Sequence, residues 1–224
     1  MVLYVAIFLE AYLMGSVPFG LLISKLGYRV DLRKHGSGNI GTTNAMRTLG
    51  FKGGALTFFL DTLKGYLAGF VALVFVAAFS GQAIGAFVWA NITPAFADAA
   101  NALPLSVALL GATMGHIFTP WLKFKGGKGV AVAAGCLFVL FGWLPGFVEI
   151  AIFAVVVLTS KYVSVGSLCA SAACPVICAI MFWGQWLTIG LCLAACVLIF
   201  WAHRENIARL RAGNERRVGQ KKPQ

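Results

Sequence analysis

Long apolar stretches separated by short polar connections make up most of this 224-residue chain. An α-helix needs about 20 apolar residues to cross the hydrocarbon core of a membrane, and shorter helices can serve where they tilt or pack together. The apolar stretches run near Val2–Ile23, Gly54–Phe79, Ala102–Phe118, Val130–Trp143, Gly146–Ser160, Val163–Trp183 and Trp186–Ala202. The pattern predicts an all-α polytopic membrane protein with seven transmembrane helices. A single integral-membrane domain is expected over residues 1–224, with the basic segment 203–224 as its tail.

The positions of lysine and arginine predict the orientation of the chain. Basic residues occur over 25–64, over 123–128, at Lys161 and over 204–222, whereas the connections near 80–101, 144–145 and 184–185 have none. Cytoplasmic segments carry the excess of Lys and Arg, so seven helices place the N-terminus outside and the C-terminus in the cytoplasm. The apolar segment Gln82–Ala97 is expected to be an external loop or interfacial helix, because one added span would move Lys123–Lys128 outside.

Composition agrees with a membrane location and argues against nucleic acid as a partner. Hydrophobic residues make up 60% of the chain and charged residues only 11%, whereas soluble domains carry about a quarter charged residues. The net charge of +11 would suit a nucleic-acid-binding protein. The basic residues, however, lie in short segments between the apolar stretches, as juxtamembrane charge does.

The first candidate functional segment, His35–Arg47, is rich in glycine and in hydrogen-bonding side chains. Glycine allows close backbone approach and unusual dihedral angles, and loop amides with an arginine suit a phosphate group. Asn44 and Arg47 are one helical turn apart, so both can point the same way. The predicted substrate-binding residues here are Gly36, Ser37, Gly38, Asn39, Thr43, Asn44 and Arg47.

The second candidate segment, Gly115–Gly129, contains Lys-Gly-Gly-Lys-Gly directly before an apolar helix. Loop amides and a helix N-terminus favour an anion. The segment is not a nucleotide-binding P-loop, because Gly129 follows Lys128 where that motif requires Ser or Thr. Membrane topology alone would explain the charges but not the glycines. The predicted substrate-binding residues here are His116, Lys123, Lys125, Gly126, Gly127, Lys128 and Gly129.

The third candidate segment, His203–Arg217, begins where the last apolar stretch ends. His203 and Asn206 are three residues apart and would share a helix face, and Glu205 could orient an arginine or a histidine. A histidine can act as a base or as a hydrogen-bond donor near neutral pH. An amphipathic basic tail on the membrane surface explains the segment equally well from spacing alone.

The remaining polar and sulfur-containing residues of the apolar stretches receive structural interpretations. Asp61 and Lys64 are three residues apart, and an internal ion pair is the preferred account of Asp61, although Lys64 could also reach a phosphate site. All six cysteines lie within apolar stretches and are interpreted as small buried side chains. No metal site is predicted, because no histidine or carboxylate lies close enough in sequence to complete a ligand set.

The three segments together resemble the bacterial acyl-phosphate:glycerol-3-phosphate acyltransferase (PlsY) family. The first is similar to the pattern Gly-Ser-x-Asn-x-Gly-x-Thr-Asn-x-x-Arg, and the second to Gly-His-x-Phe…Lys-Phe-x-Gly-Gly-Lys-Gly-Val. The third is similar to His-x-Glu-Asn-Ile-x-Arg-Leu followed by Gly-x-Glu. The departures are small: Ile40, Thr42, the order Thr119-Pro120 and a longer external loop near 80–101.

The resemblance implies a reaction, its partners and a location. An acyl group would pass from acyl phosphate to the 1-hydroxyl of glycerol 3-phosphate, giving lysophosphatidic acid and inorganic phosphate without a cofactor. The partners implied are these two substrates and the lipid bilayer, with no obligatory protein partner. The location implied is the bacterial inner membrane, with the active site at its cytoplasmic face. The active-site residues carried over by position are Ser37, Arg47, Lys128, His203 and Asn206.

Other functions stay open at the level of sequence. A transporter of phosphate-bearing anions would hold its site near mid-bilayer, whereas the basic and glycine-rich residues here lie in connections. A membrane adaptor that uses the basic tail would leave the first two segments unexplained. A CDP-alcohol phosphotransferase needs paired aspartates, and the seven acidic residues are not so arranged. For acyl transfer the base is either His203 or a donor phosphate oxygen, and the second is favoured.

Overall fold

The computed structural model describes residues 1–92 and 94–220, so Lys221 and Lys222 of the predicted tail lie outside the described residues. Helices account for most of this part, which contains no strand. The predicted all-α class is therefore confirmed. The helices are α1 (Val2–Ser16), α2 (Phe19–Tyr28), α3 (Thr42–Phe79), α4 (Ile84–Ile92), α5 (Ala102–Ile117), α6 (Val130–Leu140), α7 (Trp143–Ser160), α8 (Val163–Met181), α9 (Trp186–Ala202) and α10 (Arg204–Arg211).

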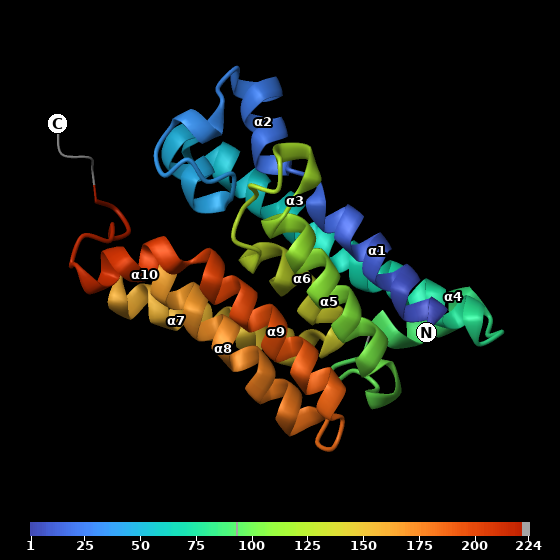
Figure 1. Ribbon diagram of the computed structural model, residues 1–224. Helices are drawn as coiled ribbons and strands as arrows, with labels where there is room; N and C mark the ends of the chain where they lie inside the picture. Colours follow the sequence, from blue (N-terminus) through green and yellow to red (C-terminus); the bar gives the residue numbers. More distant parts are fainter. Residues whose placement is uncertain (93, 221–224) are drawn as a thin grey trace.

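The long helices form two groups that lie side by side (Figure 1). In the first group α1 packs on α5 and α3, and α3 packs on α6. In the second group α8 lies between α7 and α9. Contacts of α5 with α9 and of α6 with α7 join the two groups. Side chains such as Leu109 of α5 and Val139 and Phe141 at the end of α6 form the shared apolar core.

Each predicted apolar stretch contains a helix, but two of the predicted boundaries are wrong. The first stretch is broken between Ser16 and Phe19, because Pro18 lacks the N–H that a continuous helix would use. The second helix begins at Thr42 rather than near Gly54 and breaks at Gly50, whose φ of 80° is left-handed. Within Gln82–Ala97, the expected external segment, lies the nine-residue helix α4.

Several helices are long and apolar enough to cross a membrane. Within residues 1–92 and 94–220, five candidate spans meet this condition: Val2–Tyr28, Thr42–Phe79, Ala99–Leu122, Trp143–Ser160 and Val163–Met181. The pair α9 and α10, bent by 58°, is a sixth when it is taken as one span, and α6 is a shorter apolar helix of eleven residues. A multi-span helical architecture follows, while seven crossings and the orientation of the termini stay predictions.

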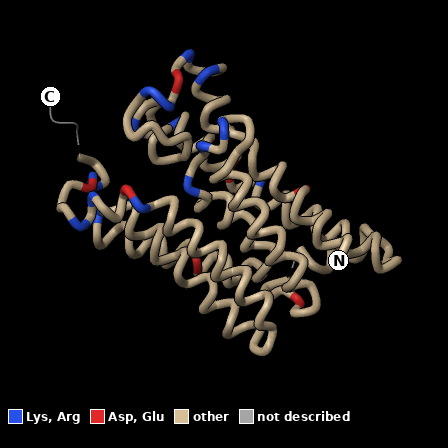
Figure 2. The backbone as a smooth tube through the Cα atoms, viewed as in Figure 1, with Lys and Arg blue, Asp and Glu red and all other residues tan. Residues whose placement is uncertain are grey.

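Basic residues are concentrated at one end of the bundle. Figure 2 shows the lysines and arginines gathered around α2, the start of α3 and α10, whereas the end with α4 and the α8–α9 connection has none in view. Segments far apart in the sequence therefore bring their cations to the same end. This distribution agrees with the orientation expected from the positive-inside rule.

Glycines allow the helices of the first group to approach very closely. A Cβ atom at Gly65 of α3 would lie 1.9 Å from the carbonyl oxygen of Val132 on α6, and one at Gly135 would lie 1.9 Å from that of Thr62. A Cβ at Gly115 of α5 would lie 2.0 Å from the carbonyl oxygen of Tyr12. Small residues at helix crossings are a main source of helix association in lipid.

We expect Gly65→Ala to destabilise the protein by at least about 2 kcal/mol, because the added methyl group must separate the α3 and α6 backbones. The matched control is Gly190→Ala on α9, where a Cβ would meet nothing within 4 Å. There the higher helix propensity of alanine should leave stability equal or slightly raised. Thermal unfolding in detergent measures both variants, and equal midpoints for the two would contradict the close packing.

Candidate active site

The first segment is folded around the side chain of Asn44, which is 2% exposed. Its amide nitrogen donates to the carbonyl oxygens of Leu32, His35 and Asn39 at 3.1, 3.0 and 2.8 Å. Its amide oxygen accepts from the backbone N–H of Ser37 at 2.9 Å. Asn44 thus uses its hydrogen-bonding capacity within the loop and fixes the loop's shape; its contact with a substrate stays a prediction.

The loop ends at the N-terminus of α3, which offers backbone donors to an anion. Gly41 occupies the N-cap position, and its residue type provides no side-chain cap for the first turn. The side chains of Ser37 and Arg47 are exposed, and Thr43 is half-buried. Free N–H groups at a helix start attract negative charge, so this part of the chain is suited to a phosphate.

The glycines of the second segment are required by packing against the end of α5. The N–H groups of Gly126 and Gly127 donate to the carbonyl oxygens of Ile117 and His116 at 2.9 and 3.0 Å. A Cβ at Gly126 would lie 2.0 Å from the carbonyl oxygen of His116, and one at Gly127 would lie 2.0 Å from its Nε2. Gly129, with a φ of 83°, is the N-cap of α6. The loop therefore presents Lys128 from a fixed backbone.

A buried charged group lies beneath this loop. Lys64, which is 4% exposed, places its Nζ 2.9 Å from Asp61 Oδ1, 2.6 Å from the carbonyl oxygen of Val17 and 2.9 Å from His116 Nδ1. The ion pair expected for Asp61 is therefore present. An ammonium group only donates, so His116 Nδ1 accepts and the ring proton lies on Nε2, toward Gly127. All three donors of Lys64 have protein partners, and its contact with a phosphate stays a prediction.

The third segment joins the second through a chain of hydrogen bonds. Lys128 Nζ donates to Asn206 Oδ1, and Asn206 Nδ2 donates to Glu215 Oε1 at 2.6 Å. Glu215 also accepts from Ser164 Oγ at 3.0 Å and from Arg209 Nε at 2.7 Å. Side chains from the α5–α6 loop, α8, α10 and the tail thus share one network.

His203 lies in the bend between α9 and α10 and is 2% exposed. Its Nδ1 lies 2.8 Å from the carbonyl oxygen of Ile199. A carbonyl oxygen only accepts, so Nδ1 carries a proton and Nε2 of the neutral ring remains an acceptor. This tautomer suits either a base or a group that positions a hydroxyl.

Electrostatics connect the first segment with the other two. Arg47 interacts through its charge with Arg216, Glu215 and Arg209, and also with Lys128. Burial lowers the pKa of Lys128 from 10.5 to about 8, with Arg209 and Arg47 adding to this effect and the carboxylates of Glu215 and Glu205 opposing it. Burial opposes ionisation of Glu215, but hydrogen bonds from Arg209 and Asn206 lower the pKa of its carboxyl group overall. The cations Arg47, Lys128, Arg209 and Arg216 therefore outnumber the carboxylates Glu215 and Glu205, which leaves net positive charge for anions.

The remaining predicted residues differ in exposure and in backbone conformation. Lys123, Lys125 and Glu205 are exposed, and Glu205 pairs with Arg209 at 3.9 Å. Gly36 and Gly38 have φ values of 62° and 72°, which the loop around Asn44 requires.

Sequence reasoning missed Glu215, Arg209 and Ser164 as members of the site. Glu215 belongs to the Gly-x-Glu part of the third pattern, and a carboxylate inside a basic tail is a usable signal. The tail folds back because the Val218 N–H donates to the Lys161 carbonyl oxygen at 2.8 Å. Nothing in the sequence near Ser164 pointed to the site.

The fold and the clustered cations define a multi-span helical membrane protein whose basic residues gather at one end of its bundle. Residues 5–213 match the family model described as glycerol-3-phosphate acyltransferase. The chain belongs to this family.

Relatives of known sequence and two solved structures are similar to this protein over almost the whole chain. Glycerol-3-phosphate acyltransferases of Rhodopseudomonas palustris are 41% identical in strain HaA2 and 44% identical in strain TIE-1, each over 98% of both chains. A crystal structure of PlsY, an integral membrane glycerol 3-phosphate acyltransferase, in its glycerol 3-phosphate form is 33% identical, with a TM-score of 0.79 over 96% of both chains. Its lysophosphatidic acid form has a TM-score of 0.77 at 32% identity, over 96% of this chain and 95% of that one.

We expect Lys64→Met to destabilise the protein by about 3–5 kcal/mol, because it leaves Asp61 buried without its cation. The double variant Asp61→Asn/Lys64→Met removes both charges and should recover most of that loss. Thermal unfolding of the purified variants in detergent measures the effect. A double variant no more stable than Lys64→Met would show that the ion pair is not what stabilises this position.

Proposed function

We propose that this protein acylates glycerol 3-phosphate, and that the donor is an acyl phosphate. The products would be 1-acylglycerol 3-phosphate and inorganic phosphate, the first acylation of phospholipid synthesis. Membership of the glycerol-3-phosphate acyltransferase family supports the acceptor. The observation that carries the proposal is the convergence of Arg47, Lys128 and Arg209 from three separate segments around one carboxylate, Glu215.

Two phosphorylated substrates explain why so many cations meet at one place. Like charges at close range repel strongly, and more so where water is partly excluded. In the proposal the α3 N-terminus with Ser37 and Arg47 binds glycerol 3-phosphate, and Lys128 binds the donor phosphate. Lys128 and nearby backbone amides would also stabilise the negative charge that develops on the acyl carbonyl oxygen.

In the proposal, a second set of residues positions the substrate-binding groups without touching the substrates. Asn206 and Glu215 hold the ammonium group of Lys128 in place, and His116 supports the glycine loop from below. An acyl phosphate is a mixed anhydride and already activated, so no covalent enzyme intermediate is needed. The proton of the attacking hydroxyl passes to a donor phosphate oxygen, with His203 Nε2 positioning that hydroxyl.

The proposed topology is seven crossings with the N-terminus outside, which sets this site at the cytoplasmic face of the bacterial inner membrane. The arrangement of cations at one end of the bundle supports it. At such a site glycerol 3-phosphate would enter from the aqueous side, and the acyl chain of the donor could remain in the bilayer.

The direct test uses purified protein, palmitoyl phosphate and labelled glycerol 3-phosphate. Labelled lysophosphatidic acid and an equal amount of inorganic phosphate are expected. Palmitoyl-CoA in place of palmitoyl phosphate should give no product, and product from the thioester alone would overturn the donor assignment. Uptake of glycerol 3-phosphate into empty vesicles without acyl transfer would instead indicate a transporter.

Lys128 should make kcat/KM fall as the pH rises through about 8, because the ammonium group of the free enzyme loses its proton there. Arginine keeps its charge to much higher pH, so Lys128→Arg should show lower activity without this fall. Lys128→Ala should lose on the order of 10²-fold or more in kcat. If the wild type and Lys128→Arg had identical pH profiles, the fall in kcat/KM would not be due to deprotonation of Lys128.

His203→Ala should retain turnover within about 100-fold of the wild type, because the donor phosphate takes the proton in the proposed mechanism. An obligatory general base contributes about 10²–10⁴-fold. His203→Gln, which restores a hydrogen-bonding group, should recover part of the loss. Complete inactivity of both folded variants in a phosphate-release assay would assign the base to His203.

A further inference from the structure

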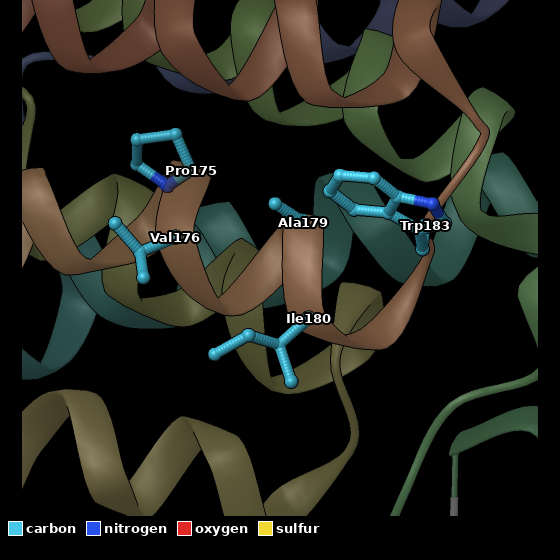
Figure 3. A pocket seen from close by; sticks show the side chains of 5 residues that line it. All are labelled: Pro175, Val176, Ala179, Ile180 and Trp183. Atoms are coloured by element: carbon cyan, nitrogen blue, oxygen red, sulfur yellow. The ribbon is translucent and has the colours of Figure 1, made fainter.

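Two apolar hollows are lined by residues outside the predicted phosphate-binding set. Figure 3 shows the first, a shallow apolar hollow along α8 lined by Pro175, Val176, Ala179, Ile180 and Trp183. Its lining offers no carboxyl, amide or charged group, so it carries no chemistry. The second is a cavity of about 300 Å³ enclosed by residues of α3 and α5 to α9. This interhelical pocket begins next to the candidate active site.

The position of the interhelical pocket follows from its lining. Val130, which directly follows the N-cap Gly129, and Ile199, whose carbonyl oxygen accepts from His203, lie at its end nearest the site. Leu137 of α6 also lines it, seven residues beyond Val130, which corresponds to about 10 Å along a helix. The pocket is thus a nearly apolar cavity that runs from the reacting groups into the bundle, as an acyl chain requires.

One lining residue does not suit an unsubstituted acyl chain. Glu149 of α7 is 4% exposed, lines the interhelical pocket, and has no hydrogen-bond partner for Oε1 within residues 1–92 and 94–220. The hydroxyl of Ser171, on the same pocket, donates instead to the carbonyl oxygen of Ser167. A buried polar group without a partner is costly, so a carboxyl group on a pocket wall indicates a ligand with a complementary group.

Glu149 lies in the part of the pocket far from the phosphate-binding residues. Its electrostatic partners are Cys174 of α8 and Cys196 of α9. It is eleven residues before the end of α7 at Ser160, whereas Ile150, Phe153 and Ala154 of the same helix line the pocket closer to that end. A complementary group must therefore be carried well down an acyl chain, not beside its carbonyl.

We infer that Glu149 is a specificity-determining residue that selects acyl chains bearing a hydroxyl group near mid-chain. The inference rests on the proposed function and names the donor class more closely. A hydroxyl both donates and accepts, so it can pair with a carboxyl group in either protonation state. A plain methylene chain would leave the carboxyl oxygen without a partner. A hydroxyl beside the acyl carbonyl would lie about two helical turns too far from Glu149.

The test compares three acyl phosphates of equal chain length: stearoyl, 10-hydroxystearoyl and 3-hydroxystearoyl phosphate. In the wild type, the ratio of kcat/KM for the 10-hydroxy donor to that for the plain donor should be at least about tenfold higher than in Glu149→Leu. Glu149→Gln keeps a donor and an acceptor and should retain most of the preference. Phe153→Leu, a pocket change without a change in polarity, is the matched control and should alter all three donors alike.

Each result decides the inference. If the kcat/KM ratio of the 10-hydroxy donor to the plain donor is the same in folded Glu149→Leu as in the wild type, the inference is wrong; this is the result expected if only water partners the carboxyl group. The inference is also wrong if the wild type prefers the 3-hydroxy donor to the plain donor as strongly as it prefers the 10-hydroxy donor. Binding of free 10-hydroxystearate and stearate to the purified protein in detergent provides a readout without catalysis. If no donor is turned over but Glu149→Leu still removes a binding preference for 10-hydroxystearate, the proposed function fails and the pocket assignment stands. If no donor is turned over and the wild type shows no binding preference for 10-hydroxystearate, both the proposed function and the role of Glu149 are wrong.

Discussion

Lys128 donates a hydrogen bond to Asn206, and this contact joins a loop packed on α5 to the helix that follows α9. Each partner is fixed from its own side. The glycine loop that carries Lys128 is bonded to the carbonyl oxygens of His116 and Ile117, and Asn206 is held by Glu215. Because Lys128 is largely removed from water, its charge depends on these neighbours, and the rest of the site is arranged around that requirement.

Asp61 and Lys64 form an ion pair in the interior of the bundle, whereas cations outnumber carboxylates at its basic end. Asp61 and Lys64 neutralise each other under the glycine loop, so they support it without adding net charge. At the basic end, Arg47, Lys128 and Arg209 all interact with Glu215, and only the exposed Glu205 adds a second carboxylate near Lys128 and Arg209. The resulting positive potential is where an anionic substrate would supply the missing negative charge. Glycines allow α3 to pack closely on α6, and α5 on α1, within the bundle that carries this basic end.

The site and the interhelical pocket together have the amphiphilic form of the proposed donor. The cationic end adjoins an almost wholly apolar cavity at Val130 and Ile199. One amphiphilic molecule can therefore place its phosphate at the cations and its acyl chain in the cavity. Glu149 is the exception in that cavity. Its burial without a hydrogen-bond partner for Oε1 among the described residues links the identity of the acyl chain to a single side chain.

Hydrophobic pattern and motif spacing determined the helical class, the approximate position of each long helix and the three segments that meet. These properties are local, because apolar length and glycine content act within a few residues. The helix breaks at Pro18 and Gly50 were also readable in principle, since each follows from one residue's backbone. The sequence likewise named Lys128, His203 and Asn206.

Only the tertiary structure decided which groups these residues touch. The side chain of Asn44 bonds to its own loop, and Lys64 pairs with Asp61 and donates to His116. Glu215 accepts hydrogen bonds from Asn206, Arg209 and Ser164. Ser164 and Glu215 are 51 residues apart, and the hydrogen bond between them exists because two helices and a returning tail bring them together. Such contacts depend on the packing of whole helices, which no local pattern encodes.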